Sequence, residues 1–322
     1  MQGEHERVDV STFGEGLAVF LADPGTPLAA AGHFRRSVAG AELNLAVGLA
    51  RLGHRVSWSG RLGDDGHGRL VRRTLRAEGI DTDGVIVDAD ASTGLMVRDV
   101  LVSRSVEVAY YRSGSAGSRL RPDDLDLAGI CRSRVLAVSG VTAALSESAF
   151  EATLLAAQVA RDAGVTVVLD PNLRVKLAPW DVQVPGLRRL CAYADIVLSG
   201  EDEALAVSGL DAPGAPVADW FLAQGCRTVV IKQGAQGAWA TDGTQTVDQA
   251  AYPVAAVDPV GAGDAFAAGF ISATLRSCSL AESLQRAAAC GALNVAVVGD
   301  VDGSPTENEL LVFLAGGRDV LR

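Results

Sequence analysis

Two glycines and a carboxylate stand together at Gly261-Ala262-Gly263-Asp264, where an apolar stretch begins that runs to about Arg276. Glycines let the backbone turn tightly with its N–H groups pointing inward. The apolar stretch predicts a helix, and the first N–H groups of a helix lack partners within it. A turn of this kind at a helix N-terminus binds anions. We therefore expect an anion cradle that carries its own carboxylate.

The carboxylate defines the chemistry that this cradle could perform. An Asp264 side chain held ionised by inward N–H groups could take a proton from a substrate hydroxyl. The same N–H groups would stabilise negative charge on a transferring phosphoryl group. The turn is not a Walker loop, because no Gly-Lys-Ser/Thr follows it. A helix N-cap aspartate after a glycine turn is the alternative interpretation, and the residues alone leave it open.

A second helix with residues suited to a ligand is predicted to start at Gly40-Ala41 and to end at Leu52-Gly53, where glycine is a typical C-cap. Gly40 leaves room for a ligand to approach the backbone closely. Asn44, one turn into the helix, offers both hydrogen-bond donors and acceptors, which suit a polyol. A polar residue that faces solvent is the competing interpretation of Asn44.

The elements that would hold these segments alternate, from about residue 134 onward, between short apolar runs and amphipathic stretches. This alternation is typical of a parallel sheet covered by helices on both faces. Ser148, with Glu151 three residues later, predicts the start of one of these helices. The expected fold is a doubly wound, mostly parallel α/β domain. The predicted strands are 134–139, 165–169, 195–198 and 228–231.

Residues 81–112 lack this alternation. Three strand-like runs follow one another there with no helix between them, at Val85–Val87, Leu95–Val102 and Val106–Tyr111. We expect an antiparallel sheet inserted into the α/β domain and placed as a lid over a site at the carboxyl ends of the main strands. A decorative sheet or a dimer contact is the alternative interpretation.

Charge and cysteine content argue against several classes of function. The 28 lysines and arginines are outnumbered by 39 aspartates and glutamates, so the net charge of −11 provides no basic surface for nucleic acid. The five cysteines form no Cys-x-x-Cys pair, which favours reduced thiols over disulfides or a zinc site. The N-terminus has no apolar leader, and no stretch of ~18 apolar residues occurs later. We expect a cytoplasmic protein without membrane contact.

Together, the Gly261–Asp264 and Gly40–Ala46 segments resemble the C-terminal and N-terminal signatures of the PfkB, or ribokinase-like, family of carbohydrate kinases. The resemblance spans about residues 8–315. It implies a ribokinase-like fold and an enzyme that transfers a phosphoryl group from ATP to a sugar hydroxyl. It also implies Mg²⁺ as the metal, held mainly by the phosphates of the nucleotide.

The resemblance has consequences for organisation as well. It implies a single kinase domain over residues 1–322, with a β-sheet lid formed mainly by about residues 81–112 and part of 14–38. Members of the family commonly pair through the lid. We therefore expect a homo-oligomer, such as a dimer that forms through this sheet, which acts on a small-molecule sugar or sugar acid.

The resemblance also implies roles for individual residues. Asp264 would be the catalytic base, with the Gly261-Ala262-Gly263 backbone as the anion hole. Glu203 would orient the Mg²⁺ shell through water. Positions on the sugar side are Gly14, Glu15, Gly40, Ala41 and Asn44. Positions on the nucleotide side are Lys232, Gly234, Gly237, Gly263 and Asn294.

The chain departs from the family pattern in two places. Gly200 stands where the family's metal-associated Asn-x-x-Glu motif has its asparagine, which affects the metal network rather than the requirement for magnesium. Pro259 and Val260 replace two threonines that usually follow the aspartate at position 258. A monovalent cation, K⁺, near Asp258 is therefore left open as a further cofactor.

Within the family, the chain most resembles the 2-keto-3-deoxygluconate kinases, through segments that include Tyr110-Tyr111-Arg112 and Asp170–Arg174. An acidic sugar bound to a net-negative protein needs local cations, and guanidinium groups grip carboxylates with two hydrogen bonds. We expect Arg112 and Arg174 to hold the substrate carboxylate, with a contact from the Tyr110 hydroxyl.

Two other functions stay open. One is a kinase of a neutral sugar such as fructose or ribose, in which Arg112 and Arg174 would have no carboxylate to bind. The other is a non-catalytic regulator on the same fold that binds a nucleotide or a sugar. Asp264 argues against a regulator, because simple binding needs no base.

Overall fold

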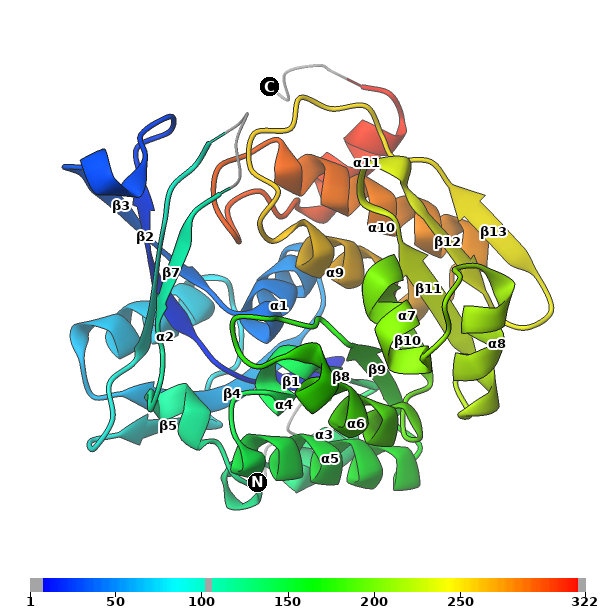
Figure 1. Cartoon of the computed structure of the whole chain (residues 1–322), viewed down its shortest axis with the longest axis horizontal. Coiled ribbons are helices and arrows are strands. Elements are labelled where there is room, and N and C mark those ends of the chain that lie inside the picture. The colour runs from blue at the N-terminus through cyan, green and yellow to red at the C-terminus, as the bar shows by residue number, and fades with distance from the viewer. Residues whose placement is uncertain (1–7, 102–105, 318–322) are drawn as a thin grey trace, which may run out of the picture.

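The computed structural model describes residues 8–101 and 106–317. Within them, a nine-stranded sheet carries helices on both faces, and a separate four-stranded sheet stands at one side (Figure 1). This is the α/β architecture that the sequence predicts, with the expected small second sheet. No helix in these two ranges is both long enough and apolar enough to span a bilayer.

The large sheet has the order β13-β12-β11-β10-β9-β8-β1-β4-β5 and is parallel except for β12 and β13 at one edge. The order of β8 to β11 along the sheet follows their order along the chain, and β1, β4 and β5 extend the sheet on the other side of β8. Its strands are β1 (Val10–Phe13), β4 (Val56–Gly63), β5 (Val85–Asp88), β8 (Val135–Ser139), β9 (Thr166–Asp170), β10 (Ile196–Gly200), β11 (Thr228–Lys232), β12 (Ala238–Thr241) and β13 (Thr246–Gln249).

Alternate side chains of the central strands enter two different hydrophobic cores. In β8, Val135 and Ala137 belong to one core, whereas Leu136 and Val138 belong to the other. Successive side chains of a strand point to opposite faces, so a strand buried on both faces must be apolar throughout. This explains why these strands read as continuous apolar runs in the sequence.

Each core is closed by its own set of helices. The first core includes residues of α1 (Ala41–Arg51), α2 (Gly66–Ala77), α9 (Ala262–Leu275), α10 (Leu280–Val295) and α11 (Glu307–Leu314). The second includes residues of α3 (Leu127–Arg132), α5 (Glu147–Asp162), α6 (Trp180–Cys191), α7 (Glu201–Ser208) and α8 (Ala215–Ala223). A short α4 (Gly140–Ala143) directly follows β8.

The start of α5 differs slightly from the prediction. Ser146, not Ser148, is the N-cap, and its side chain accepts a hydrogen bond from the Ala149 N–H. The serine that caps is therefore the one two residues earlier, and both residues can perform this role. All five cysteines lie in the described ranges as free thiols, and Cys191, Cys226 and Cys290 are buried.

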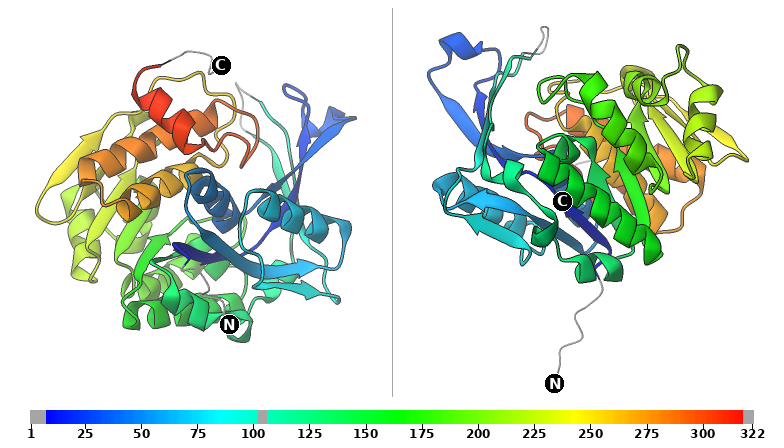
Figure 2. Two further views of the ribbon diagram at one scale, coloured as in Figure 1. Left: turned by 180° about the vertical axis from the view of Figure 1, so that it is seen from behind. Right: turned by 60° about the horizontal axis from the view of Figure 1, so that its bottom comes forward.

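The small sheet has the order β3-β2-β6-β7, and Figure 2 shows it standing beside the main sheet. Its strands are β2 (Leu17–Ala22), β3 (Phe34–Ala39), β6 (Gly94–Arg98) and β7 (Val108–Tyr111). Two segments far apart in the sequence thus contribute two strands each. Their junction, β2 against β6, is parallel, so the sheet is mixed rather than purely antiparallel as expected.

The prediction for Val85–Val87 was wrong. These residues form most of β5, which pairs in parallel with β4 at the edge of the main sheet. A parallel pair needs a crossover connection, and α2 provides it between the two strands. Of the run predicted over Leu95–Val102, the strand ends at Arg98, and Val102 lies outside the described residues.

Each face of the small sheet packs in part against the rest of the chain. On one face, apolar side chains form a cluster with the partly buried Val298, and its members are Leu17, Val19, Leu21, Ala39, Met96 and Val100. On the other face, Phe20 contacts the His67 ring of α2 edge-on, with the ring centres 5.7 Å apart. The small sheet therefore contacts the rest of the chain on both faces, and we call it the lid.

Candidate active site

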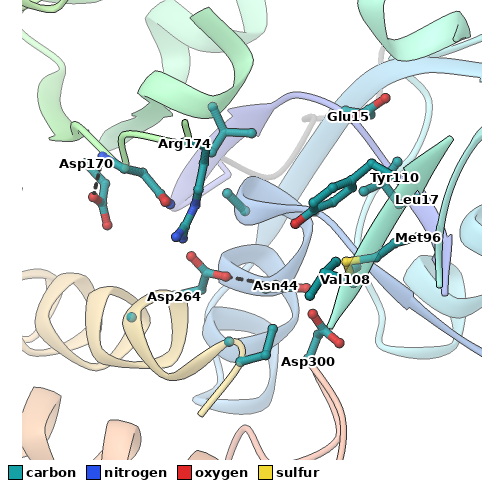
Figure 3. A pocket seen from close by; sticks show the side chains of 18 of the residues that line it. Glu15, Leu17, Asn44, Met96, Val108, Tyr110, Asp170, Arg174, Asp264 and Asp300 are labelled. Atoms are coloured by element: carbon teal, nitrogen blue, oxygen red, sulfur yellow. Dashed lines mark hydrogen bonds between the residues drawn. The ribbon is translucent and has the colours of Figure 1, made fainter. Parts of the chain in front are cut away.

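A cavity of about 400 Å³ lies between the lid and the carboxyl ends of the main strands. Asp170, Gly200 and Lys232, which end β9, β10 and β11, line it from the sheet. Met96 and Tyr110 line it from the lid, as Figure 3 shows. Ligands of open α/β sheets bind at this end of the strands.

Asp264, the third residue of α9, points into this cavity (Figure 3). The side chain of Asn44, from α1, donates a hydrogen bond of 2.8 Å from Nδ2 to the Asp264 Oδ2. The base predicted from one signature and the asparagine predicted from the other are therefore in direct contact. They are 220 residues apart in the sequence.

The ionisation of Asp264 differs from the prediction. Its pKa is raised to about 7, mainly by burial and also by the nearby Asp170 charge, although the Asn44 hydrogen bond, Arg174 and Lys232 lower it. The carboxyl group is thus only partly ionised near neutral pH, because desolvation outweighs the groups that favour the anion. A pKa near the working pH suits a general base.

The turn before Asp264 requires a glycine at the N-cap of α9. Gly261 is the N-cap of α9 and adopts a φ of +84°. A Cβ atom there would lie 2.2 Å from the carbonyl oxygen of Asp300, so only glycine fits. Gly261 and Gly263 line the cavity, whereas Ala262 is not among the lining residues.

Lys232 and Glu203 form a charged group beside Asp170. The Lys232 Nζ lies 2.7 Å from the Asp170 Oδ2. Burial disfavours the lysine charge, but the carboxylates of Asp170 and Glu203 outweigh it and raise the pKa of Lys232. Burial also raises the pKa of Glu203, whose Oε2 accepts a hydrogen bond of 2.9 Å from the Gly200 N–H. One Glu203 oxygen thus caps α7.

Besides Ala262, four predicted site residues do not line the cavity. Gly237 supports a turn in which a Cβ would lie 2.0 Å from the Gln249 carbonyl oxygen, and Gly234 has a φ of +56° in the same turn. Asn294 is fully buried. Gly14 lies against Glu42, where a Cβ would meet the carboxyl oxygen at 2.5 Å. The structure shows a local backbone or packing reason for each of these, and their predicted ligand roles remain predictions.

The remaining predicted residues on the sugar side all line the cavity: Glu15, Gly40, Ala41, Asn44, Tyr110, Arg112 and Arg174. Two of them are paired with each other, because Arg112 forms an ion pair with the buried Glu15. Ser115 also donates a hydrogen bond of 2.7 Å to Glu15. Arg112 therefore does not have the free guanidinium that the sequence suggested. It lies over the Tyr110 ring, with Cζ 5.3 Å from the ring centre.

Sequence reasoning missed three carboxyl groups at or near the cavity. Asp170 directly follows the predicted strand 165–169, and that position was a usable signal. Asp300 lies in the loop between α10 and α11, and burial raises its pKa to about 6 although Arg98 opposes this. Burial raises the pKa of Glu42 to about 8, with a smaller contribution from the Asp264 charge. Glu42 is thus mostly uncharged at neutral pH.

The residues present fit some of the implied ions better than others. Among the described residues, no group of three or more His, Cys, Asp or Glu side chains is placed to hold a metal. This fits Mg²⁺ carried by nucleotide phosphates, with Glu203 and Asp170 nearby. A K⁺ ion on the Asp258 carboxylate does not fit, because both oxygens accept hydrogen bonds from Arg98, at 3.1 and 2.7 Å.

Comparisons with known proteins agree with this geometry. The model of the pfkB family of carbohydrate kinases matches residues 9–307. The chain is 36% identical to a 2-dehydro-3-deoxygluconokinase of Bacillus subtilis over 98% of each chain. It is also 32% identical to fructokinase-1 of Zea mays, over 95% of this chain and 97% of that one.

Solved structures share the fold. A PfkB protein from Polaromonas sp. JS666 matches with a TM-score of 0.86 and 38% identity, over 94% of this chain and 99% of its own. A ribokinase II from E. coli, described as putative and in complex with ATP and Mg²⁺, matches with a TM-score of 0.89 and 26% identity, over 96% and 99%. The chain belongs to the pfkB family of carbohydrate kinases. It is an ATP-dependent sugar kinase.

The raised pKa of Asp264 predicts that this residue limits stability. The pKa of the carboxyl group rises from 3.8 in the unfolded chain to about 7 in the fold, so the protonated group favours folding. Its stabilising effect is complete below the unfolded pKa and is lost as the pH rises through the folded pKa. Asp264→Asn keeps an oxygen acceptor for Asn44 and removes the charge. Without nucleotide or Mg²⁺, we expect the Tm of Asp264→Asn at pH 8 to be ~2–4 °C higher than that of the unmodified protein.

Differential scanning calorimetry at pH 5 and pH 8 measures this effect. The gain in Tm should be smaller at pH 5, where the folded protein already holds the proton. A Tm that falls at pH 8, or a gain of equal size at both pH values, would mean that the carboxylate is not strained by burial.

Proposed function

We propose that the protein transfers the γ-phosphoryl group of ATP to the 6-hydroxyl of 2-keto-3-deoxygluconate. The observation that carries the proposal is that Arg174 faces the same cavity as Asp264, as Figure 3 makes visible. Among the described residues, no carboxylate forms an ion pair with Arg174. A guanidinium inside a cavity that forms no ion pair with a protein carboxylate is suited to an anionic group of the substrate.

The three cationic side chains of the cavity differ in whether a carboxylate already neutralises them. Lys232 is neutralised by Asp170, and Arg112 by Glu15. Arg174 is left as the cation with the most capacity for a new carboxylate, and Arg112 would contribute through its remaining N–H groups. The similarity to a 2-dehydro-3-deoxygluconokinase supports a sugar acid as the substrate.

The residues around the anion cradle support a direct transfer of the phosphoryl group. Asp264 takes the proton of the sugar hydroxyl while the hydroxyl oxygen forms a bond to the γ-phosphorus. The bond between that phosphorus and the oxygen that bridges to the β-phosphate breaks, and its electron pair stays on ADP. Asn44 holds the Asp264 carboxyl in position through its hydrogen bond. The Gly261–Gly263 backbone stabilises the charge on the transferring group.

The nucleotide side has residues that suit the phosphates and their metal. Lys232 would attract the phosphates, and Glu203 would hold Mg²⁺ through water, with one carboxyl oxygen already bonded to Gly200. Mg²⁺ bound to the phosphates would neutralise part of their negative charge. The E. coli ribokinase II complex supports this pairing of ATP and Mg²⁺.

A kinase of a neutral sugar is the second candidate. The ion pair between Arg112 and Glu15 favours it, because one of the two expected carboxylate ligands already has a partner. The similarity to a fructokinase supports the same alternative. Fructose is therefore the neutral substrate to compare with the sugar acid.

Asp264→Asn should fold and lose turnover. Without the base, and with the anion cradle intact, we expect kcat to fall by roughly 10³-fold or more. The measurement is the initial rate of ADP formation at saturating ATP and sugar, with the melting curve as evidence of folding. A variant that keeps near-normal kcat would exclude Asp264 as the base.

Arg174→Met should discriminate between acid and neutral substrates. Loss of a charge-assisted contact worth ~1.5–3 kcal/mol lowers kcat/KM for 2-keto-3-deoxygluconate by roughly ten- to hundred-fold. For fructose, which lacks the carboxylate, kcat/KM should change little. Equal losses on both substrates would show that Arg174 serves the phosphoryl group or the fold, and the neutral-sugar kinase would then be favoured.

A test of Arg112 needs a second substitution at Glu15, because Arg112→Met alone leaves Glu15 buried without a counterion. The double variant Glu15→Gln with Arg112→Met removes both charges together. A loss specific to the acid in the double variant, compared with Glu15→Gln alone, assigns a substrate contact to Arg112. No difference between these two variants would limit its role to holding Glu15.

A further inference from the structure

Arg98, the last residue of β6 in the lid, is buried completely among residues of the main domain. Its guanidinium donates two hydrogen bonds to Asp258, Nη1 to Oδ1 at 3.1 Å and Nη2 to Oδ2 at 2.7 Å. Nη2 also donates to the Asp300 Oδ2 at 2.9 Å. Both carboxylates are buried as well. A buried charge is tolerated only with such close partners.

The two carboxylates belong to the loops that shape the anion cradle. Asp258 stands three residues before Gly261, and its Oδ1 accepts a hydrogen bond from the Val260 N–H at 3.2 Å. Its Oδ2 accepts one from the Gly299 N–H at 3.0 Å. The Asp300 carbonyl is the group against which Gly261 packs without a side chain. One guanidinium from the lid thus joins the loops before and after the cradle.

We propose that Arg98 is a positioning residue whose fixed guanidinium neutralises Asp258 and Asp300 and so holds the two loops at the anion cradle, in place of an exchangeable monovalent cation. The charge comes from the lid, so the cradle reaches its working geometry only when the lid is docked. The proposal rests on the kinase activity of the family and not on which sugar is the substrate. Because the cation is part of the chain, turnover should be independent of K⁺.

The rest of the lid offers a matched comparison. Arg35, on β3, also reaches the loop after α10, where its Nη2 donates to the Val298 carbonyl at 2.8 Å and its Nη1 to Asp302 at 3.2 Å. The Arg35 side chain is 48% exposed, whereas that of Arg98 is 0% exposed. Exposed ion pairs contribute little, so Arg35→Ala controls for the loss of a lid arginine as such.

The first measurement uses the unmodified enzyme. ADP formation is followed directly by chromatography, because coupling enzymes have cation requirements of their own. K⁺ is varied from zero to about 100 mM against choline at constant ionic strength. We expect kcat and KM for ATP to change by less than about twofold. Activation of several-fold by K⁺ would overturn the proposal, whatever the variants do.

The second measurement asks whether an added cation can replace the side chain. Arg98→Ala should lower kcat by at least roughly tenfold, and ~50 mM guanidinium or K⁺ should restore several-fold of that loss. Neither ion should speed the unmodified enzyme or Arg35→Ala. The kcat of Arg98→Lys, which keeps the charge, should lie between that of the unmodified enzyme and that of Arg98→Ala. It should also respond less to added ions.

A purely structural role for Arg98 gives a different pattern. Arg98→Ala would then lose activity in a folded state, as judged by its melting curve, and no cation would restore it. That result, or normal kinetics in the folded variant, would overturn the proposal. If Arg98→Ala does not fold, the same comparison is made with Arg98→Lys. A loss of kcat in this variant that neither guanidinium nor K⁺ reduces counts against the proposal, whereas a kcat close to that of the unmodified enzyme supports a role for the charge.

Discussion

The central constraint on this site is the burial of the Asp264 carboxyl group inside the protein. Burial raises its pKa to about 7, so the group titrates close to neutral pH. The hydrogen bond from Asn44 limits that rise and fixes the orientation of the carboxyl group. The first turns of α1 and α9 must therefore lie against each other beside the cavity, and the packing between these two helices provides this arrangement.

The lid lines one side of the cavity, and buried charges join it to the loops around the turn before Asp264. Its apolar face packs on the loop that contains Val298, and Arg98 reaches through to Asp258 and Asp300. Charged groups buried in this way are strongly directional, because each must keep its partners. The position of the lid and the shape of the turn before Asp264 are thus parts of one arrangement.

Local patterns were sufficient to predict the main features. The glycine turn before Asp264, the helix that contains Asn44, and the alternation of strands and helices are all short-range signals, and the structure has each of them. The family resemblance, which the pfkB match confirms, added the expectation that these distant segments share one site.

Features that depend on long-range pairing escaped sequence reasoning. Val85–Val87 joined the wrong sheet in the prediction, because its partner β4 lies across a helix and apolar runs do not reveal pairing. The ion pair between Arg112 and Glu15 changes what that arginine can bind, and nothing in the sequence near either residue indicates it. The same is true of Arg98 and Asp258, which are 160 residues apart. Charges alone do not show which carboxylate an arginine will meet.

The pH dependence of kcat/KM tests most directly whether a buried Asp264 acts as the base. The assay keeps ATP saturated with Mg²⁺ at each pH, so that the free enzyme's groups determine the profile. We predict that kcat/KM falls about tenfold per pH unit below a pKa near 7, and that the pKa is higher in Asn44→Ala, which loses the hydrogen bond that lowers it. A profile that stays level to pH 5, or whose pKa is the same in Asn44→Ala, would contradict this account.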